Sequence, residues 1–289
     1  MKKLPSLLLL TFLTACNNGT TSISNSTGTS NNGTTSISGS GSTSNNDSKT
    51  STSTGEIGKE KYWDVSNTDI SHIDKDNRLI CFTFDDGPIS NTANQLLDVF
   101  DNFNKNYASE GFEAHGTFFY KGINVVEANK STIERAIKSK FQIGNHTLNH
   151  KHLEDLPARE IKAEVNGTIT NLNKFVDVNE ALVRLPFGTY NDLVLDTINY
   201  PLINWTNGLD TLDWSGKSAD EIYATVINNL CEGVIVLMHE GYQTTINAVK
   251  KLLPALYERG YQVVTINEYC KARDIKLERH KVYTYLDDL

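Results

Sequence analysis

The sequence predicts an α/β fold in which helices cover a parallel sheet. From residue 79 onward, short apolar runs alternate with longer amphipathic stretches, and this alternation is typical of repeated strand–helix units. About 190 residues with seven strand-like runs suit one closed or nearly closed barrel. We therefore expect a single folded domain over residues 79–270, with the flanking residues outside it.

Seven short apolar runs are the expected strands. They lie at residues 79–84, 116–120, 141–144, 182–185, 202–205, 234–238 and 262–266. Between them, five longer stretches carry apolar residues at helical spacing. The expected helices lie at residues 91–103, 130–139, 158–175, 218–230 and 245–259.

The first residues have the composition of an export signal. Lys2 and Lys3 precede an apolar run that is too short to span a bilayer as a helix. Leu-Thr-Ala then leads directly into Cys16, and this pattern resembles the bacterial lipoprotein signal. The resemblance implies a signal peptide at residues 1–15, cleavage before Cys16 and a lipid anchor on it. The protein would then be exported and held at a bacterial membrane, facing the periplasm or the cell surface; an ordinary signal peptide is the alternative.

The remaining segments outside the domain differ from it in composition. Residues 16–58 consist mainly of Ser, Thr, Asn and Gly, which cannot bury enough apolar surface to order themselves, so we expect a disordered tether. Residues 59–78 form a lead-in segment, and residues 271–289 form a charged C-terminal tail. The formal net charge is −8. Because no basic stripe is present, the composition argues against nucleic acid as a partner.

Five short polar clusters occur along the chain in a fixed order, and most of them stand at the end of a predicted strand. They are Thr-Phe-Asp-Asp-Gly-Pro at 83–88, His-Thr-Leu-Asn-His at 146–150, Arg-Leu-Pro-Phe-Gly at 184–188, Asp-Thr-Leu-Asp-Trp at 210–214 and Leu-Met-His at 237–239. In parallel α/β barrels, the loops at the carboxyl ends of the strands build the active site. The clusters can supply metal ligands and still leave a base and an acid. This pattern indicates a metal-dependent hydrolase.

The order and content of the clusters resemble the polysaccharide deacetylase family, also called the NodB-homology domain or carbohydrate esterase family 4, over about residues 79–270. The resemblance implies a distorted (β/α)7 barrel. It also implies removal of N-acetyl groups from amino sugars of an acetylated cell-envelope or extracellular polysaccharide. An O-acetyl esterase of the xylan type and a catalytically weak sugar-binding lipoprotein are the alternatives. The sequence does not choose among peptidoglycan, chitin oligomers, poly-N-acetylglucosamine and xylan.

The resemblance assigns a metal ion to Asp86, His146 and His150. Two imidazoles and one carboxylate leave coordination positions open for water and substrate, which suits one divalent ion. Zn²⁺ is the expected ion, with Co²⁺ as the alternative. The peptide lacks the Glu of His-Glu-x-x-His, so the pattern does not favour a zincin protease.

The same resemblance implies how protons are handled. Asp85 would be the general base, paired with Arg184. His239 would protonate the leaving amine, with Asp213 orienting its ring.

The remaining implied roles concern the acetyl group. The backbone N–H of Phe187 would stabilise the oxyanion, and Trp214 and Leu237 would line the pocket for the methyl group. Two residues depart from the family pattern, with Phe187 in place of tyrosine and Glu240 in place of aspartate. Four histidines fit no role, namely His72, His115, His152 and His280.

Overall fold

The computed structural model describes residues 61–176, 178 and 180–286. The expected signal peptide at 1–15, the expected anchor on Cys16 and the expected tether at 16–58 lie outside these residues. Within the described part of the chain, no helix combines the length and the apolar character that a membrane span requires.

Strand β1 (Arg78–Asp85) is the centre of the predicted parallel sheet. On one side, β6 (Tyr261–Val264) pairs with the first half of β1 and β2 (Thr117–Tyr120) pairs with the second half. Strand β3 (Gln142–Asn145) extends the sheet beyond β2, and β5 (Ile235–His239) runs along the other side of β1. All of these pairings are parallel, as the alternation of strands and helices predicts.

The ring of strands continues from β3 to β5 through short pairings. Val183 bridges in parallel to Asn145 and to Leu202 of β4 (Leu202–Ile203), and the Thr206 N–H donates to the carbonyl of Ile235 at 3.0 Å. The predicted strand at 182–185 is thus reduced to bridges at Val183. Pro186 lacks an N–H and cannot extend a ladder, which accounts for the early end. The expected barrel is confirmed in this distorted form.

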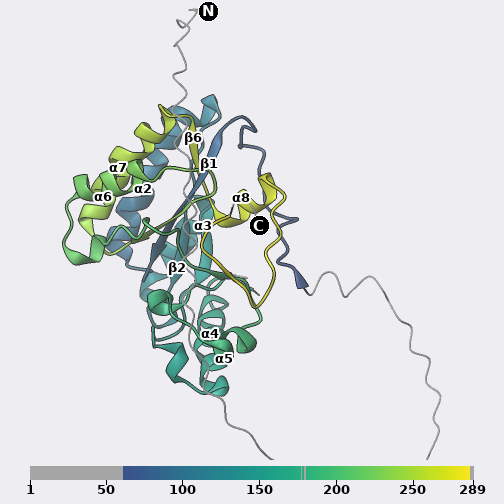
Figure 1. Cartoon of the computed structure of the whole chain (residues 1–289). Helices are drawn as coiled ribbons and strands as arrows, with labels where there is room; N and C mark the ends of the chain where they lie inside the picture. The colour runs from purple at the N-terminus through teal and green to yellow at the C-terminus, as the bar shows by residue number, and fades with distance from the viewer. Residues whose placement is uncertain (1–60, 177, 179, 287–289) are drawn as a thin grey trace, which may run out of the picture. The chain divides into compact units, whose positions relative to one another are not determined.

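The five predicted helices are present and pack around the sheet (Figure 1). They are α2 (Ser90–Tyr107), α3 (Lys130–Lys138), α4 (Ala158–Leu172), α6 (Ala219–Asn228) and α7 (Gln243–Tyr257). Helix α7 packs between α2 and α6, and Figure 1 shows the three side by side. The short 3-10 helices are Ala108–Glu110, Gly122–Asn124, Glu127–Asn129, Leu153–Asp155, Pro186–Gly188 and Asp213–Ser215.

Two further helices, α5 (Asp192–Thr197) and α8 (Ile266–Ala272), were not predicted from periodicity because each spans fewer than three turns. Local capping explains why they form. The Asn191 side chain accepts the N–H of Val194 at the start of α5. Helix α8 begins with a capping box in which Thr265 and Glu268 bind each other's backbone N–H.

The lead-in segment and the C-terminal residues belong to the folded unit. Leu277, Tyr283 and Leu286 are almost fully buried, and β7 (Val282–Tyr283) pairs in parallel with β4. The Trp63 N–H donates to the Leu277 carbonyl at 2.8 Å. Residues on both sides of the predicted domain therefore complete its core.

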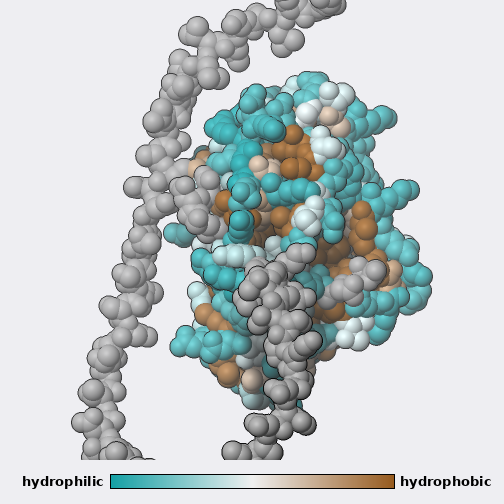
Figure 2. All heavy atoms as spheres, turned by 90° about the vertical axis from the view of Figure 1, so that its right-hand side faces the viewer, coloured by the Kyte–Doolittle hydropathy of each residue, from teal (hydrophilic) through white to brown (hydrophobic). Residues whose placement is uncertain are grey.

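Most large hydrophobic side chains are buried, and Figure 2 shows those near one face as patches between hydrophilic residues. Several large hydrophobic residues of the described chain are nevertheless exposed. Two of them, Phe187 and Trp214, belong to the polar clusters, and Tyr242 follows the last cluster by three residues.

Candidate active site

Strand register brings the polar clusters to one end of the sheet. Asp85 and His239, the last residues of β1 and β5, are paired. In the neighbouring pairing, Tyr120 of β2 pairs with Asn145 of β3, so that His146 follows at the same edge. Because the strands are parallel, their carboxyl ends deliver these side chains together.

Asp86, His146 and His150 form one of two groups of potential metal ligands among the described residues. One ligand atom from each lies within 4.8 Å of the others. The Asp86 Oδ1 atom is 3.8 Å from the Nε2 of His146 and 3.7 Å from the Nε2 of His150. The set that the sequence assigned to a metal therefore converges on one point.

The two imidazoles present their lone pairs to this point. The Nδ1 of His146 lies 2.9 Å from the Arg184 carbonyl, which can only accept, so Nδ1 carries the proton and Nε2 is free. Burial and the neighbouring His146 lower the pKa of His150 to about 4. The His150 ring can therefore serve as a neutral ligand near neutral pH, and His146 offers its Nε2.

The carboxylate of Asp86 also fits a cation. Its Oδ1 atom is buried and accepts no hydrogen bond from the described residues, while the Lys121 ammonium lies 3.4 Å away. Burial opposes its ionisation, but the neighbouring histidines and Lys121 outweigh burial and lower the pKa of Asp86. Lys121 was not identified from the sequence because no motif includes it. Two imidazoles and an unsatisfied carboxylate oxygen are a donor set that suits a divalent ion.

Asp85 is held by a fully buried arginine. The Arg184 Nη1 donates to Asp85 Oδ1 at 2.8 Å and to the Thr83 hydroxyl at 2.6 Å. The other donors of Arg184 reach the carbonyls of Ile203 and Asn204, each at 2.9 Å. The second oxygen of Asp85 lies 3.6 Å from the Nε2 of His146, beside the metal-ligand group.

His239 is held by a second carboxylate. The ring Nδ1 of His239 lies 2.7 Å from Asp213 Oδ1. The backbone N–H of His239 donates to Asp213 Oδ2 at 2.7 Å. The Thr245 hydroxyl and the Trp214 N–H also donate to Asp213. Burial favours the neutral ring, but the hydrogen bond to Asp213 and the nearby Asp85 outweigh it, so the pKa of His239 is raised. Thr245 lies on α7, outside every motif.

Several site residues occupy the left-handed backbone region. Asp86, Thr147, His150 and Phe187 all have φ between 57° and 74°. Such a conformation costs a non-glycine residue about 1–2 kcal/mol, and side-chain hydrogen bonds to the backbone offset it. The N–H of Thr147 donates to the Asn145 side chain at 2.8 Å, for example.

The turn between the two histidines is braced from α4. Buried Glu164 accepts both the N–H and the side-chain amide of Asn149, at 2.7 and 2.9 Å. Neither Asn145 nor Glu164 was predicted as a site residue, because their partners come from the tertiary fold or from a neighbouring loop.

The three predicted acetyl-pocket residues differ in exposure. Phe187 is 52% exposed, and its ring stacks on His152 at 3.9 Å between centroids and meets His150 edge-on at 4.6 Å. Trp214 is 54% exposed, whereas Leu237 is buried within β5. His152, which fitted no role, therefore contacts the site through the Phe187 ring.

Comparison with known proteins agrees with this geometry. The polysaccharide deacetylase family matches residues 72–200. A peptidoglycan-N-acetylglucosamine deacetylase of Bacillus cereus is 30% identical over 212 residues, which cover 71% of this chain and 91% of the relative. The peptidoglycan-N-acetylmuramic acid deacetylase PdaC of Bacillus subtilis is 30% identical over 196 residues, which cover 68% of this chain.

The match to PdaC spans about two fifths of that relative's length, 39%. The solved structure of PdaC superposes with a TM-score of 0.63 at 29% identity, covering 70% of this chain and 94% of the solved chain. The likeness therefore concerns the barrel that carries the candidate site.

Glu240, the second departure noted in the sequence, supports the loop that carries Asp86. Its carboxyl group is fully buried and accepts the Ile89 N–H, and a Cβ at Gly87 would overlap it. Burial raises the pKa of Glu240 to about 8. The side chain is therefore protonated in the folded protein near neutral pH.

We expect Glu240→Gln to change how stability depends on pH. Between about pH 4.5 and pH 8 the unfolded carboxyl ionises while the folded one stays protonated, so the free energy of unfolding of the wild type falls as pH rises. Glutamine keeps the acceptor for Ile89 but cannot ionise. Urea unfolding at about pH 5 and about pH 8.5 should show the variant gaining several kcal/mol relative to wild type. Parallel pH profiles for the two proteins would contradict this assignment.

Proposed function

The chain belongs to the polysaccharide deacetylase family, and we propose that it is a metal-dependent hydrolase that removes N-acetyl groups from amino sugars of a cell-envelope or extracellular polysaccharide. The observation that carries the proposal is the convergence of Asp86, His146 and His150 beside two separate proton-handling pairs. The names of the relatives support the choice of an acetylated amino sugar as the substrate.

We assign one divalent ion, Zn²⁺ first and Co²⁺ as the alternative, to Asp86, His146 and His150. When bound, the ion supplies Lewis acidity and lowers the pKa of a water molecule toward neutrality. The three side chains would hold the ion through one carboxylate oxygen and two ring nitrogens. His146 keeps its orientation because its Nδ1–H donates to the Arg184 carbonyl.

Asp85 accepts the proton of the attacking water as the general base. Its Oδ1 is occupied by the Arg184 guanidinium at 2.8 Å, which leaves Oδ2 on the side of the metal ligands. The guanidinium fixes the direction of the carboxylate and balances its charge in a buried position. General base catalysis of this kind contributes roughly 10²–10⁴-fold to the rate.

His239 donates a proton to the leaving amine. With Nδ1–H directed at Asp213, the Nε2 of His239 is the atom that can reach the substrate. The raised pKa of His239, to which Asp213, Asp85 and Asp86 contribute against burial, favours the protonated ring that an acid requires. Asp213 acts as a positioning residue, since its other contacts are to Thr245 and the Trp214 N–H.

The acetyl group is placed between the two pairs. We assign the backbone N–H of Phe187 to the developing oxyanion, because Phe187 follows Arg184 in a turn beside His150. Trp214 and Leu237 are assigned to the pocket for the acetyl methyl. The exposed ring of Trp214 can contact a sugar unit, whereas Leu237 contributes from within β5.

Export and anchoring belong to the same proposal. An enzyme for cell-envelope polymers must reach them, and the proteins that the chain resembles are named for peptidoglycan. We propose that Cys16 carries a lipid anchor after removal of residues 1–15 and that residues 16–58 act as its tether.

Replacing Cys16 should release the protein from the membrane. In Cys16→Ser the residue that would accept the lipid is absent, so we expect the exported protein in the soluble fraction, whereas wild type stays with membranes. Fractionation with mass spectrometry of the mature N-terminus is the measurement. An exported wild-type protein that is soluble and carries no lipid would refute the anchor.

The proposed activity should appear as acetate release that requires a metal ion. We expect release from peptidoglycan, chitin oligomers or poly-N-acetylglucosamine, loss of release after chelation, and recovery with Zn²⁺ or Co²⁺. Acetylated xylan serves as the ester arm of the same assay. Full release by chelated protein would contradict the metal requirement, and release from xylan alone would contradict an N-deacetylase.

Replacing Asp85 and Asp86 by asparagine should have different effects, although the two residues are adjacent. Asp85→Asn cannot accept the proton of water, so kcat should fall by about 10²–10⁴-fold while the metal is retained. Asp86→Asn removes a charged ligand, so its metal affinity should fall, and excess metal should partly restore its turnover. Metal content and kcat are measured side by side, with His239→Ala as a third variant that should keep the metal. Metal loss in Asp85→Asn together with retention in Asp86→Asn would reverse the two roles.

A further inference from the structure

The second group of potential metal ligands lies outside the candidate active site and consists of His72, His115 and Glu268. His72 comes from the lead-in segment, His115 lies two residues before β2, and Glu268 lies in the first turn of α8. One ligand atom from each lies within 4.8 Å of the others. Four residues along β2 span roughly 13 Å, so the group is well separated from the strand ends that carry the candidate active site.

The distances suit a tetrahedral ion. Ligand atoms around a tetrahedral Zn²⁺ lie roughly 3.4 Å apart when each bond is close to 2.1 Å. The Nε2 of His72 is 3.4 Å from the Oε1 of Glu268, and the Nδ1 of His115 is 2.7 Å from the same oxygen. The distance between His115 and Glu268 would have to increase by about 0.7 Å to accommodate the ion.

His72 is the side chain that the fold leaves unsatisfied. It is 7% exposed, and neither of its ring nitrogens makes a hydrogen bond within residues 61–286 as far as they are described. A buried imidazole without a partner costs free energy. A cation between the three residues would give one of the two ring nitrogens of His72 a partner.

The surroundings of the other two residues match those of metal ligands. The Nε2 of His115 lies 3.2 Å from Glu113, so that nitrogen can donate to a carboxylate and leave Nδ1 free for an ion. Glu113 in turn pairs with Lys140 at 2.8 Å. The second oxygen of Glu268 accepts the Thr265 N–H at 2.7 Å, which directs Oε1 toward the histidines.

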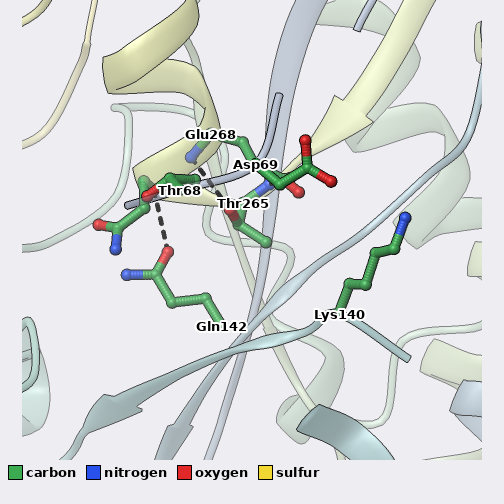
Figure 3. A pocket seen from close by; sticks show the side chains of 7 residues that line it. Thr68, Asp69, Lys140, Gln142, Thr265 and Glu268 are labelled. Atoms are coloured by element: carbon green, nitrogen blue, oxygen red, sulfur yellow. Dashed lines mark hydrogen bonds between the residues drawn. The ribbon is translucent and has the colours of Figure 1, made fainter. Parts of the chain in front are cut away.

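A pocket beside Glu268 offers a route for an ion and water. Its volume is about 290 Å³, and Asp69, Lys140 and Gln142 line it together with the first residues of α8. Figure 3 shows how these side chains come from the lead-in segment, the start of β3 and α8.

We propose that His72, His115 and Glu268 form a second, structural divalent-metal site, with Zn²⁺ as the best-suited ion. Three protein ligands with an imidazole-rich set favour Zn²⁺ over Mg²⁺ or Ca²⁺, and water from the pocket completes the coordination. The ion would join the lead-in segment, β2 and α8, which lie far apart in the sequence. Its function is to stabilise the fold around β1.

A proton is the competing occupant. A doubly protonated His115 between Glu113 and Glu268 would satisfy those three residues without any ion. It would leave both nitrogens of His72 without a hydrogen-bond partner, whereas an ion would bind one of them. The two occupants differ in the number of metal ions that the protein holds.

Counting ions distinguishes them. The full chain, produced without a polyhistidine tag, is stripped with chelator, dialysed against Zn²⁺ or Co²⁺ and analysed by mass spectrometry for metal per chain. We expect two ions in wild type, one in His72→Ala, one in His150→Ala and none in the double variant. Exposed His280→Ala is the matched control and should keep two. In His150→Ala, which retains only the second site, excess Zn²⁺ should raise Tm by roughly 5–10 °C when it exceeds the Kd about 100-fold.

The metal content of the wild type and of His150→Ala tests the second site even if the variants that lack His72 do not fold. A wild type with one ion, lost in His150→Ala, would overturn the second site while leaving the candidate active site intact. An ion that persists in the double variant would place it elsewhere and would also overturn the proposal. Neither result depends on acetate release, so the two proposals can fail separately.

Discussion

The buried guanidinium of Arg184 is the contact on which the candidate site depends. It is fully buried, and it reaches Asp85, the Thr83 hydroxyl and the carbonyls of Ile203 and Asn204. A buried charge is tolerated only when its donors are satisfied, and losing one partner costs about 3–5 kcal/mol. The backbone carbonyl of the same residue fixes the tautomer of His146. One arginine thus joins β1 to β4 and orients both a carboxylate and an imidazole.

Two carboxylates of the candidate site, those of Asp85 and Asp213, have different kinds of partner. Asp85 faces a cation that stays charged, whereas Asp213 faces an imidazole whose charge can change. Strand register places the Arg184–Asp85 pair next to the His239–Asp213 pair, since Asp85 pairs with His239. Pairs whose environments favour opposite protonation states are what acid–base chemistry at one centre requires.

Polar side chains also sustain the backbone that presents the ligands. Asp86 and His150 lie in the left-handed region, and the neighbouring turns are braced by Asn145 and Glu164. The second histidine cluster follows the same pattern, with Glu113 and Thr265 supporting His115 and Glu268. Glu164 on α4 supports its loop from a separate element, whereas Asn145, Glu113 and Thr265 act within two or three residues of the groups they contact.

The alternation of strands and helices can be predicted from the sequence, because the apolar spacing that defines each element is local. The sequence also singles out Asp85, Asp86, His146, His150, Arg184, Asp213 and His239, since each stands in one of the short polar clusters. The remaining features depend on tertiary contacts. Helix α8 and β7 are too short for periodicity, and Thr245 and Lys121 belong to no pattern. His115 meets Glu268 across 153 residues, and a contact of that separation leaves no trace in local spacing because it forms only when the barrel brings the segments together.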